Sequence, residues 1–260
     1  EVLTNIELQF ENIEKKFADF EDVMENNEYE EVIGLVKVID EMIAHIGVVV
    51  EEAPDVVLLV DKILPNRIKE IRDTYERMVN KNYPLDYLKV PYNLEQIENK
   101  INDIKTRIKI LNLEESVFEL KTFLDYLDSL YTDFDVEKRS KKIFDETARN
   151  FKIKLEKVNK IVSDIYDQLD DIKSMYNLTS DDLNDLESVN KELYNANNSF
   201  NAIIGDLKNK VCSYSKLKNR IGSLANGFVS VEESLNLCLK SLGSMHDDEM
   251  RAREQIDEVT

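Results

Sequence analysis

Apolar residues recur at alternating steps of three and four along most of this 260-residue chain. Such steps place the apolar side chains on one face of an α-helix, so the pattern predicts long amphipathic helices that pack by those faces. One series near the N-terminus consists of Ile6, Phe10, Ile13, Phe17, Phe20 and Met24, and a second runs from Leu94 to Leu111. A third extends from Leu217 to Val259 and predicts a helix over 215–260.

The longest series begins at Leu113 and reaches Tyr176 with one interruption. The interrupting stretch, DVEKRSKK at 135–142, holds a single apolar residue, Val136, between Phe134 and Phe144. No residue between 113 and 177 breaks a helix, so the pattern predicts one continuous helix of about 98 Å. We interpret the interruption as the place where this helix leaves one bundle and enters the next, so that its buried face rotates.

Breaks between the helices are few. Two adjacent asparagines, 26 and 27, predict a turn, and the stretch NYPLDYLKVPYN at 82–93 predicts a loop because its prolines remove backbone donors. Pro54 is expected inside a continuing helix or in its first turn. Asn112 predicts a sharp reversal. The expected N-caps are Asn93, Thr179 or Ser180, and Ser215.

These helices assemble into an all-α fold, an elongated rod of spectrin-like antiparallel three-helix bundles joined by shared continuous helices. Residues 1–52 form a partial repeat of two helices, and residues 53–138 and 139–260 form three-helix repeats. This topology places the 82–92 loop and the 212–215 turn beside the polar stretch 135–142. We expect Tyr83, Leu85, Tyr87 and Leu88 to cover that junction; the same aromatic loop could instead be a docking site.

Composition supports helices and limits the partners. Six glycines and four prolines are too few for the turns of a many-stranded sheet. The net charge of −19 repels nucleic acid and anionic lipid, so nucleic-acid binding is not expected. The apolar runs at 46–50 and 56–60 are far shorter than the roughly 20 residues of a membrane helix. Helical periodicity already present at the first residues predicts a piece cut from a longer protein.

The sequence offers no chemistry for catalysis. His45 and His246 lie far apart, and the glycines fall in helical segments, so neither a nucleophile with its base nor a phosphate-binding loop can be assembled. The aspartate pairs at 170–171, 181–182 and 247–248 lack the spacing of a calcium loop. Cys212 and Cys238 are too far apart along one helix for a disulfide. We expect no enzyme, no cofactor and no metal.

Two stretches resemble the EzrA family of septation ring formation regulators from low-GC Gram-positive bacteria. In residues 63–97 the matching positions are Leu64, Pro65, Tyr75, Met78, Tyr83, Leu85 and Leu88; in MHDDEMRARE at 245–254 they are Asp248, Glu249, Ala252, Arg253 and Glu254. The chain departs from the family pattern where Thr74 and Asn82 replace glycines, Pro84 a tyrosine, Tyr87 a histidine, and His246–Asp247 two basic residues.

The resemblance implies a non-enzymatic cytoplasmic scaffold of cell division. Such a protein would bind FtsZ and other division proteins, modulate the FtsZ ring, and sit on the cytoplasmic side of the membrane at the division septum. Its membrane tether would be an N-terminal helix outside this chain, and it could form a homo-oligomer. The candidate residues for partner binding or junction packing are Tyr75, Met78, Tyr83, Leu85, Tyr87 and Leu88.

Two other readings share the same helical patterns. A eukaryotic cytoskeletal crosslinker or spacer built from spectrin-type repeats would carry actin-binding domains, but such repeats usually place a tryptophan in their first helix and this chain has none. A secreted helical surface antigen would carry a cleavable leader, and two unpaired cysteines are unusual in that compartment.

Overall fold

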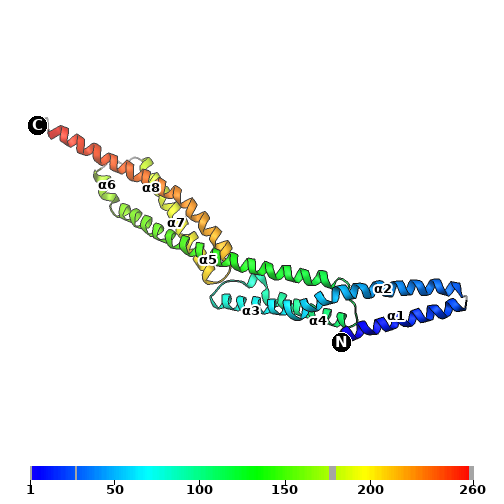
Figure 1. Cartoon of the computed structure of the whole chain (residues 1–260). Coiled ribbons are helices and arrows are strands. Elements are labelled where there is room, and N and C mark those ends of the chain that lie inside the picture. The colour runs from blue at the N-terminus through cyan, green and yellow to red at the C-terminus, as the bar shows by residue number, and fades with distance from the viewer. Residues whose placement is uncertain (1, 27, 176–179, 258–260) are drawn as a thin grey trace. The chain divides into compact units, whose positions relative to one another are not determined.

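The structure, a computed structural model, describes residues 2–26, 28–175 and 180–257, with side chains described for 2–26, 28–174 and 180–241. It is all-α over these residues, as predicted (Figure 1). The helices are α1 (Val2–Glu25), α2 (Tyr29–Leu58), a π-helical segment (Leu59–Ile63), α3 (Leu64–Asn80), a 3-10 turn (Asp86–Leu88), α4 (Val90–Lys109), α5 (Ser116–Asp167), α6 (Leu169–Met175), α7 (Ser180–Lys208) and α8 (Tyr214–Asp257).

The chain divides into two compact units, Glu1–Phe134 and Asp135–Thr260. Helix α5 crosses the division without a break and contributes its first part, 116–134, to one unit and its longer second part, 135–167, to the other. The expected helical bundles that share a continuous helix are therefore present. No helix in the described part of the chain combines the length and the apolar character needed to cross a lipid bilayer.

In the first unit, helical residues follow one another without interruption from Tyr29 to Asn80. Pro54 lies inside the continuing helix α2, which is one of the two positions expected for it. Pro65 lies in the first turn of α3. Just before Pro65 the helix widens to a π-helix, in which the N–H of Leu64 bonds the carbonyl of Leu59 five residues back. Because Pro65 has no N–H and would crowd the carbonyl of Asp61, the wider turn lets the helix continue.

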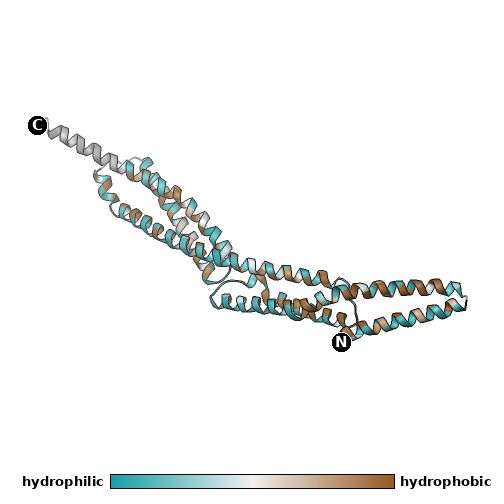
Figure 2. Ribbon diagram, viewed as in Figure 1, coloured by the Kyte–Doolittle hydropathy of each residue, from teal (hydrophilic) through white to brown (hydrophobic). Residues whose placement is uncertain are grey.

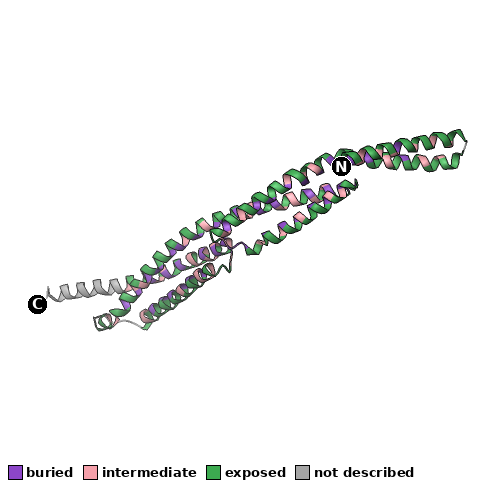
Figure 3. Cartoon of the chain, turned by 90° about the horizontal axis from the view of Figure 1, so that it is seen from below, coloured by how far each residue is buried: buried purple, intermediate pink, exposed green. Residues whose placement is uncertain are grey.

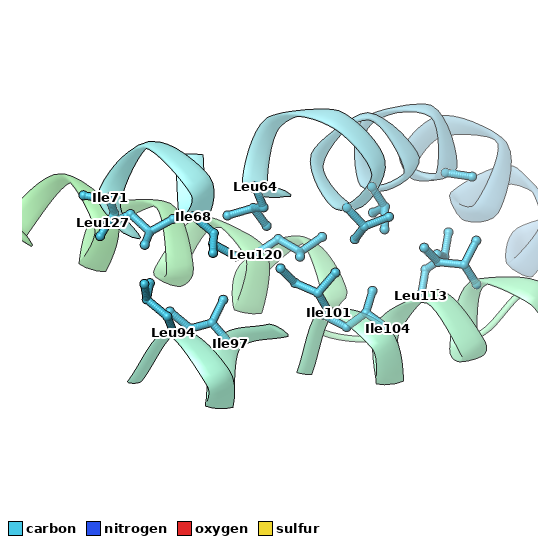
Figure 4. Close-up of a cluster of buried hydrophobic side chains, with 14 of the residues drawn as sticks. Leu64, Ile68, Ile71, Leu94, Ile97, Ile101, Ile104, Leu113, Leu120 and Leu127 are labelled. Atoms are coloured by element: carbon cyan, nitrogen blue, oxygen red, sulfur yellow. The ribbon is translucent and has the colours of Figure 1, made fainter. Parts of the chain in front are cut away.

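The core of the first unit is a continuous cluster of apolar side chains from α2, the π-helical segment, α3, α4 and the part of α5 before residue 135, joined by Ile13 of α1. Figure 4 shows part of this cluster. Leu64 and Ile71 from α3 point toward Leu94 from α4 and Leu120 and Leu127 from α5. Every one of these five side chains is almost completely buried. Each buried side chain of this size stabilises the fold by roughly 1.5–3 kcal/mol, so the cluster is the main source of stability for this unit.

The apolar face of α1 is less covered than its regular pattern suggested. Ile13 is the one buried side chain among the described residues of this helix, and Phe10, Phe17 and Met24 are exposed. Figure 3 shows that the hairpin of α1 and α2 carries mostly the colour of exposed residues. Helix α1 packs against α2 along its length and touches α4 only at its start. One neighbouring helix covers one row of side chains, so part of the apolar face of α1 stays exposed.

In the second unit, α7, α8 and the second part of α5 form a three-helix arrangement around buried aromatic rings. The ring centroid of Phe151 on α5 lies 5.5 Å from that of Phe200 on α7 and 5.2 Å from that of Phe228 on α8. The amides of Asn159 and Asn197 exchange hydrogen bonds of 3.1 and 2.9 Å beside this core. Aromatic contacts of this kind fix how three helices meet.

The long helix is shorter than predicted at both ends. Residues 113–115 form a turn rather than helix, with Glu115 at φ 59°, and α5 begins at Ser116. At the other end Gln168 separates α5 from α6. The chain does not reverse there, because Gln168 still donates to Asp164 and Ile172 to Gln168, four residues back in each case.

Three helices end with the same hydrogen-bonded motif. After α3, α4 and α7, a residue with positive φ follows the last turn: Asn82, Leu111 and Lys210 respectively. The next residue then donates its N–H to the carbonyl five residues back, as Tyr83 does to Met78. This is the Schellman arrangement, which normally uses glycine at the positive-φ position. The reversal predicted at Asn112 is therefore centred on Leu111.

The expected N-caps also shift. Helix α4 begins at Val90, so Asn93 lies inside it and is not its N-cap. Helix α8 begins at Tyr214, and the hydroxyl that accepts the N–H of Lys216 in its first turn belongs to Ser213 and not to Ser215. Ser180 is the first residue of α7, while Thr179 lies outside the described residues, as does Asn27 of the expected first turn. In each case the cap that forms is set by where the chain enters the bundle, which local sequence does not define.

Candidate functional site in the α3–α4 loop and the polar step of α5

The loop between α3 and α4 is anchored in the core by its own residues. Met78 and Leu85 are buried in the first unit, and the Met78 carbonyl accepts the N–H groups of Lys81 (3.0 Å) and Tyr83 (3.1 Å). Tyr83 and Leu88 pack, partly buried, against the same apolar cluster. The loop is thus a fixed part of the bundle.

The two candidate tyrosines outside this anchor differ in exposure. Tyr75 is partly buried against the core, and burial together with the nearby Asp86 carboxylate raises the pKa of its hydroxyl. Tyr87 is 54% exposed and presents its ring at the surface. The structure therefore brings Tyr75, Met78, Tyr83, Leu85 and Leu88 together in one core and leaves Tyr87 as the side chain accessible to a partner.

Asn93 ties the loop to α5. Its side-chain nitrogen donates to the Leu88 carbonyl (3.2 Å) and to the Tyr126 hydroxyl (2.6 Å). Burial raises the pKa of Tyr126, although the hydrogen bond from Asn93 acts in the opposite direction. Beside Tyr75, a shallow depression of about 350 Å³ lies between α3 and α4, where Arg72 pairs with Glu98 at 2.9 Å.

The polar stretch 135–142 has an explanation within the second unit. Glu137 and Ser140 are buried, and Val136, the only apolar residue of the stretch, is exposed. The buried positions Phe134, Glu137, Ser140 and Phe144 follow one another at steps of three, three and four. The row that faces the core is therefore continuous, and two of its positions are polar.

The carboxylate of Glu137 binds the first turn of α8. One oxygen accepts the N–H of Tyr214 at 2.8 Å and the other accepts the N–H of Ser215 at 3.1 Å. These backbone donors have no partner inside their own helix, and the N-terminus of a helix carries partial positive charge. A buried carboxylate is thereby satisfied, and the expected proximity of the 212–215 turn to 135–142 is confirmed.

Lys141 completes the cluster around Tyr214. Its ammonium lies 2.8 Å from the Tyr214 hydroxyl and 4.5 Å from the centre of the ring, where the π-face is negative. The Phe144 ring meets the Tyr214 ring edge-on, with centroids 6.0 Å apart. The polar step of α5, by which we mean Glu137, Ser140 and Lys141, therefore holds the start of α8. That the α3–α4 loop also covers this polar step stays a prediction.

Sequence reasoning missed Glu137, Ser140 and Tyr214. The step from Phe134 to Glu137 keeps helical spacing, which was a usable signal, but a glutamate at a core position has no visible partner in the sequence. That partner lies 77 residues away. The candidates at 245–254, including the 247–248 aspartate pair, have side chains outside those that the structure describes.

The arrangement offers structural contacts rather than reactive groups. Both oxygens of Glu137 are occupied by backbone donors, and the described residues contain no group of three or more side chains able to hold a metal ion. Both cysteines are free thiols. The fold and this site define an α-helical bundle protein in which a polar step of one helix binds the start of another.

Comparison with known proteins places the chain within that class. The model of the family described as "Septation ring formation regulator, EzrA" matches residues 1–260, and the chain belongs to this family. A regulator of that name from Listeria monocytogenes serotype 4b (strain CLIP80459) is 20% identical over 259 residues, covering 100% of this chain and 45% of the relative.

A second relative is more distant in identity. The regulator from Lactococcus lactis subsp. cremoris (strain MG1363) is 18% identical over 254 residues, covering 97% of this chain and 44% of the relative. The chain thus spans less than half the length of these curated relatives. No solved structure matches the chain.

Proposed function

We propose that this chain is part of a non-enzymatic scaffold that regulates bacterial cell division by contacting FtsZ filaments. The observation that carries the proposal is the family match along all 260 residues, because the family is described as a regulator of septation ring formation. The two helical bundles suit a scaffold, since one unbroken helix, α5, belongs to both.

The proposal extends to location and assembly. The scaffold acts on the cytoplasmic side of the membrane at the division septum. A helix outside these residues tethers it to the membrane. Other division proteins bind the same scaffold. Tyr87 is the candidate contact residue, because it is exposed on a loop that the core holds in place, and a fixed aromatic side chain is a favourable anchor for a partner.

Co-sedimentation with polymerised FtsZ tests the proposal. The 260-residue chain is expected to pellet with FtsZ filaments and to stay in the supernatant when FtsZ is kept unpolymerised. If it stays in the supernatant in both cases while a full-length relative pellets, the FtsZ contact is not in these residues and they act as a spacer.

A pair of tyrosine variants locates the contact. Tyr87→Ala is expected to reduce the pelleted fraction. Tyr194→Ala, which removes an even more exposed ring (67% against 54%) from α7, is expected to leave it unchanged. Circular dichroism of each variant checks that the helical content is retained. Equal loss in both variants would show that the contact is not at the α3–α4 loop.

A further inference from the structure

The middle of α5 is basic in an otherwise acidic chain. Residues 138–160 hold nine Lys or Arg against three Asp or Glu, whereas the whole chain has 34 Lys or Arg against 53 Asp or Glu. This stretch belongs to the second unit, on the part of α5 whose Phe151 packs against α7 and α8. In Figure 2 hydrophilic and hydrophobic residues alternate along this part of the helix, as expected where one side is buried and the other faces water.

The nine bases fall into two groups. Four form ion pairs within the chain: Lys138 with Asp135 (3.2 Å), Lys141 with Asp145 (3.7 Å), Lys152 with Glu156 (3.6 Å) and Lys154 with Glu232 (3.1 Å). The other five are exposed and form no ion pair within the described residues: Arg139, Lys142, Arg149, Lys157 and Lys160. The acids of this stretch therefore leave more than half of its positive charge uncompensated.

The five unpaired bases share one side of the helix. Counted from Arg139, the other four lie 3, 10, 18 and 21 residues further on. These distances are close to whole turns, which fall at about 3.6, 10.8, 18 and 21.6 residues. The five bases, which we call the basic stripe, extend about 32 Å along α5. Ile153, which is 60% exposed, and Glu146 lie at the same whole-turn spacing, so the stripe contains one apolar and one acidic residue.

The basic stripe is the outer side of a complete three-helix arrangement. The buried residues of this part of α5, among them Phe151, Leu155 and Val158, lie on the opposite side of the helix. Both α7 and α8 pack on that buried side. All three helices of the arrangement are present in the chain, so the stripe is not a face that a further helix of the same bundle has to cover.

A stripe one helix wide fits a narrow acidic ligand. A lipid bilayer or a nucleic-acid duplex is a broad anionic surface, and the first unit, with 30 Asp or Glu against 15 Lys or Arg, would repel it. A second copy of the chain brings a net charge of −19 to a molecule of the same charge. A single acidic helix brings its carboxylates without a second acidic bundle, so charge complementarity favours it.

We propose that the basic stripe of α5 binds an acidic α-helical segment of a partner protein. The segment lies along α5, sets Asp or Glu at whole-turn spacing against the five bases, and places an apolar side chain on Ile153. Exposed ion pairs are individually weak, so the binding depends on several of them acting together. The stripe lies in the second unit and Tyr87 in the first, so this inference does not depend on the proposed contact with FtsZ.

Two synthetic helical peptides, each about as long as the stripe, probe it with the intact 260-residue chain. One carries Glu at whole-turn spacing around a central Leu, and the other carries Gln in place of each Glu. At about 0.1 M salt the screening length is about 10 Å, which limits repulsion by distant acids. In fluorescence anisotropy titrations the Glu peptide is expected to bind at least about tenfold more tightly than the Gln peptide. Its affinity is expected to fall as more salt is added.

A matched pair of lysine variants locates the binding. Lys157 lies in the basic stripe, whereas Lys191 lies on α7; both are exposed, and neither forms an ion pair within the described residues. Lys157→Glu is expected to weaken binding of the Glu peptide at least about fivefold, because it replaces an attraction by a repulsion. Lys191→Glu makes the same change in net charge and is expected to alter the affinity by about twofold or less.

Four results would overturn the proposal. The first is equal binding of the two peptides, or binding of neither. The second is an equal effect of Lys157→Glu and Lys191→Glu in chains whose circular dichroism shows unchanged helicity. The third is co-sedimentation of the chain with vesicles of phosphatidylglycerol and phosphatidylcholine that Lys157→Glu abolishes, because the occupant would then be a lipid surface. The fourth is self-association in analytical ultracentrifugation that Lys157→Glu abolishes, because a second copy would then cover the stripe.

Discussion

Glu137 shows how a charged residue is accommodated at a core position of a helical bundle. A carboxylate removed from water is costly unless hydrogen bonds replace its hydration. Here the two oxygens accept the N–H groups of Tyr214 and Ser215, which would otherwise be unpaired donors at the start of α8. The glutamate and the helix terminus satisfy each other, so the contact specifies where α8 begins relative to α5.

Removing this carboxylate should destabilise the second unit. Glu137→Ala leaves two backbone donors buried and unpaired, and we expect a loss of roughly 2–4 kcal/mol in the free energy of unfolding. Glu137→Gln keeps one acceptor and most of the volume, so its loss should be smaller. Urea denaturation followed by circular dichroism measures both. Glu146→Ala, which removes an exposed carboxylate from the same helix, is the control. If Glu137→Ala lowers the free energy of unfolding by less than this control does, the hydrogen bonds of Glu137 do not stabilise the second unit.

The positive φ angles of single residues at the helix ends give a second prediction. Lys210 at φ 55° adopts a conformation that is unfavourable for a residue with a β-carbon, whereas asparagine, as at Asn82 with φ 62°, tolerates it better. Lys210→Gly should stabilise the chain by about 0.5–1 kcal/mol, and Asn82→Gly by less. Thermal unfolding measures the stabilisation by each variant. A larger stabilisation by Asn82→Gly than by Lys210→Gly would contradict this prediction.

Cys238 provides a pH-dependent prediction. Burial, and to a lesser degree the carboxylates of Asp185 and Asp182, raise the pKa of its thiol. In a Cys212→Ser variant, alkylation of Cys238 should reach half its maximal rate at a higher pH in the folded chain than in urea. The unfolded thiol ionises first as pH rises, so this residue should lower stability only on the alkaline side. If alkylation reaches half its maximal rate at the same pH in the folded chain and in urea, the pKa of Cys238 is not raised by folding.

Helices α1 and α5 show that a regular apolar pattern does not determine how much of a helix is buried. Both carry the same three-and-four spacing, yet Phe10 and Phe17 on α1 are exposed while Phe144 and Phe151 on α5 are buried. The difference is the number of neighbours: α1 has α2 along its length, whereas α5 packs inside three-helix arrangements. Burial follows from tertiary contacts that the pattern permits but does not supply.

The contribution of helix packing can be measured at Phe151. Its ring contacts both Phe200 and Phe228, so Phe151→Ala should leave a cavity where three helices meet and cost about 3–5 kcal/mol. Phe118→Ala, on the same helix but 74% exposed, should change the stability by no more than about 0.5 kcal/mol. Similar losses in the two variants, measured by urea denaturation, would show that the aromatic cluster is not the anchor of the second unit.

For the whole molecule, the division into two units that share one helix predicts independent local unfolding. In hydrogen–deuterium exchange, Phe151→Ala should increase exchange in α7, α8 and the second part of α5. Exchange in α3 and α4 should not change, because their core lies in the first unit. If exchange rises equally in both units, the chain unfolds as a single cooperative body, and the division between Phe134 and Asp135 has no energetic meaning.

Much of this molecule could be predicted from local spacing. The helices, the loop between α3 and α4, and the burial of Leu85 and Met78 were accessible because each depends on nearby residues. Helix ends were less predictable: a leucine at φ 59° and a cap at Ser213 depend on how the chain enters its bundle. The exposure of Tyr87 likewise depends on a turn whose direction the sequence does not specify.

The sequence by itself determined that this protein is built from long amphipathic helices, because helical periodicity is a local property repeated along the whole chain. It also determined the acidic surface and, through matching residues, the family. Only the tertiary structure decided the role of the polar stretch 135–142 and the incomplete burial of α1. Both depend on which segments meet in space: Glu137 finds its partners 77 residues away, and α1 finds only one long neighbour.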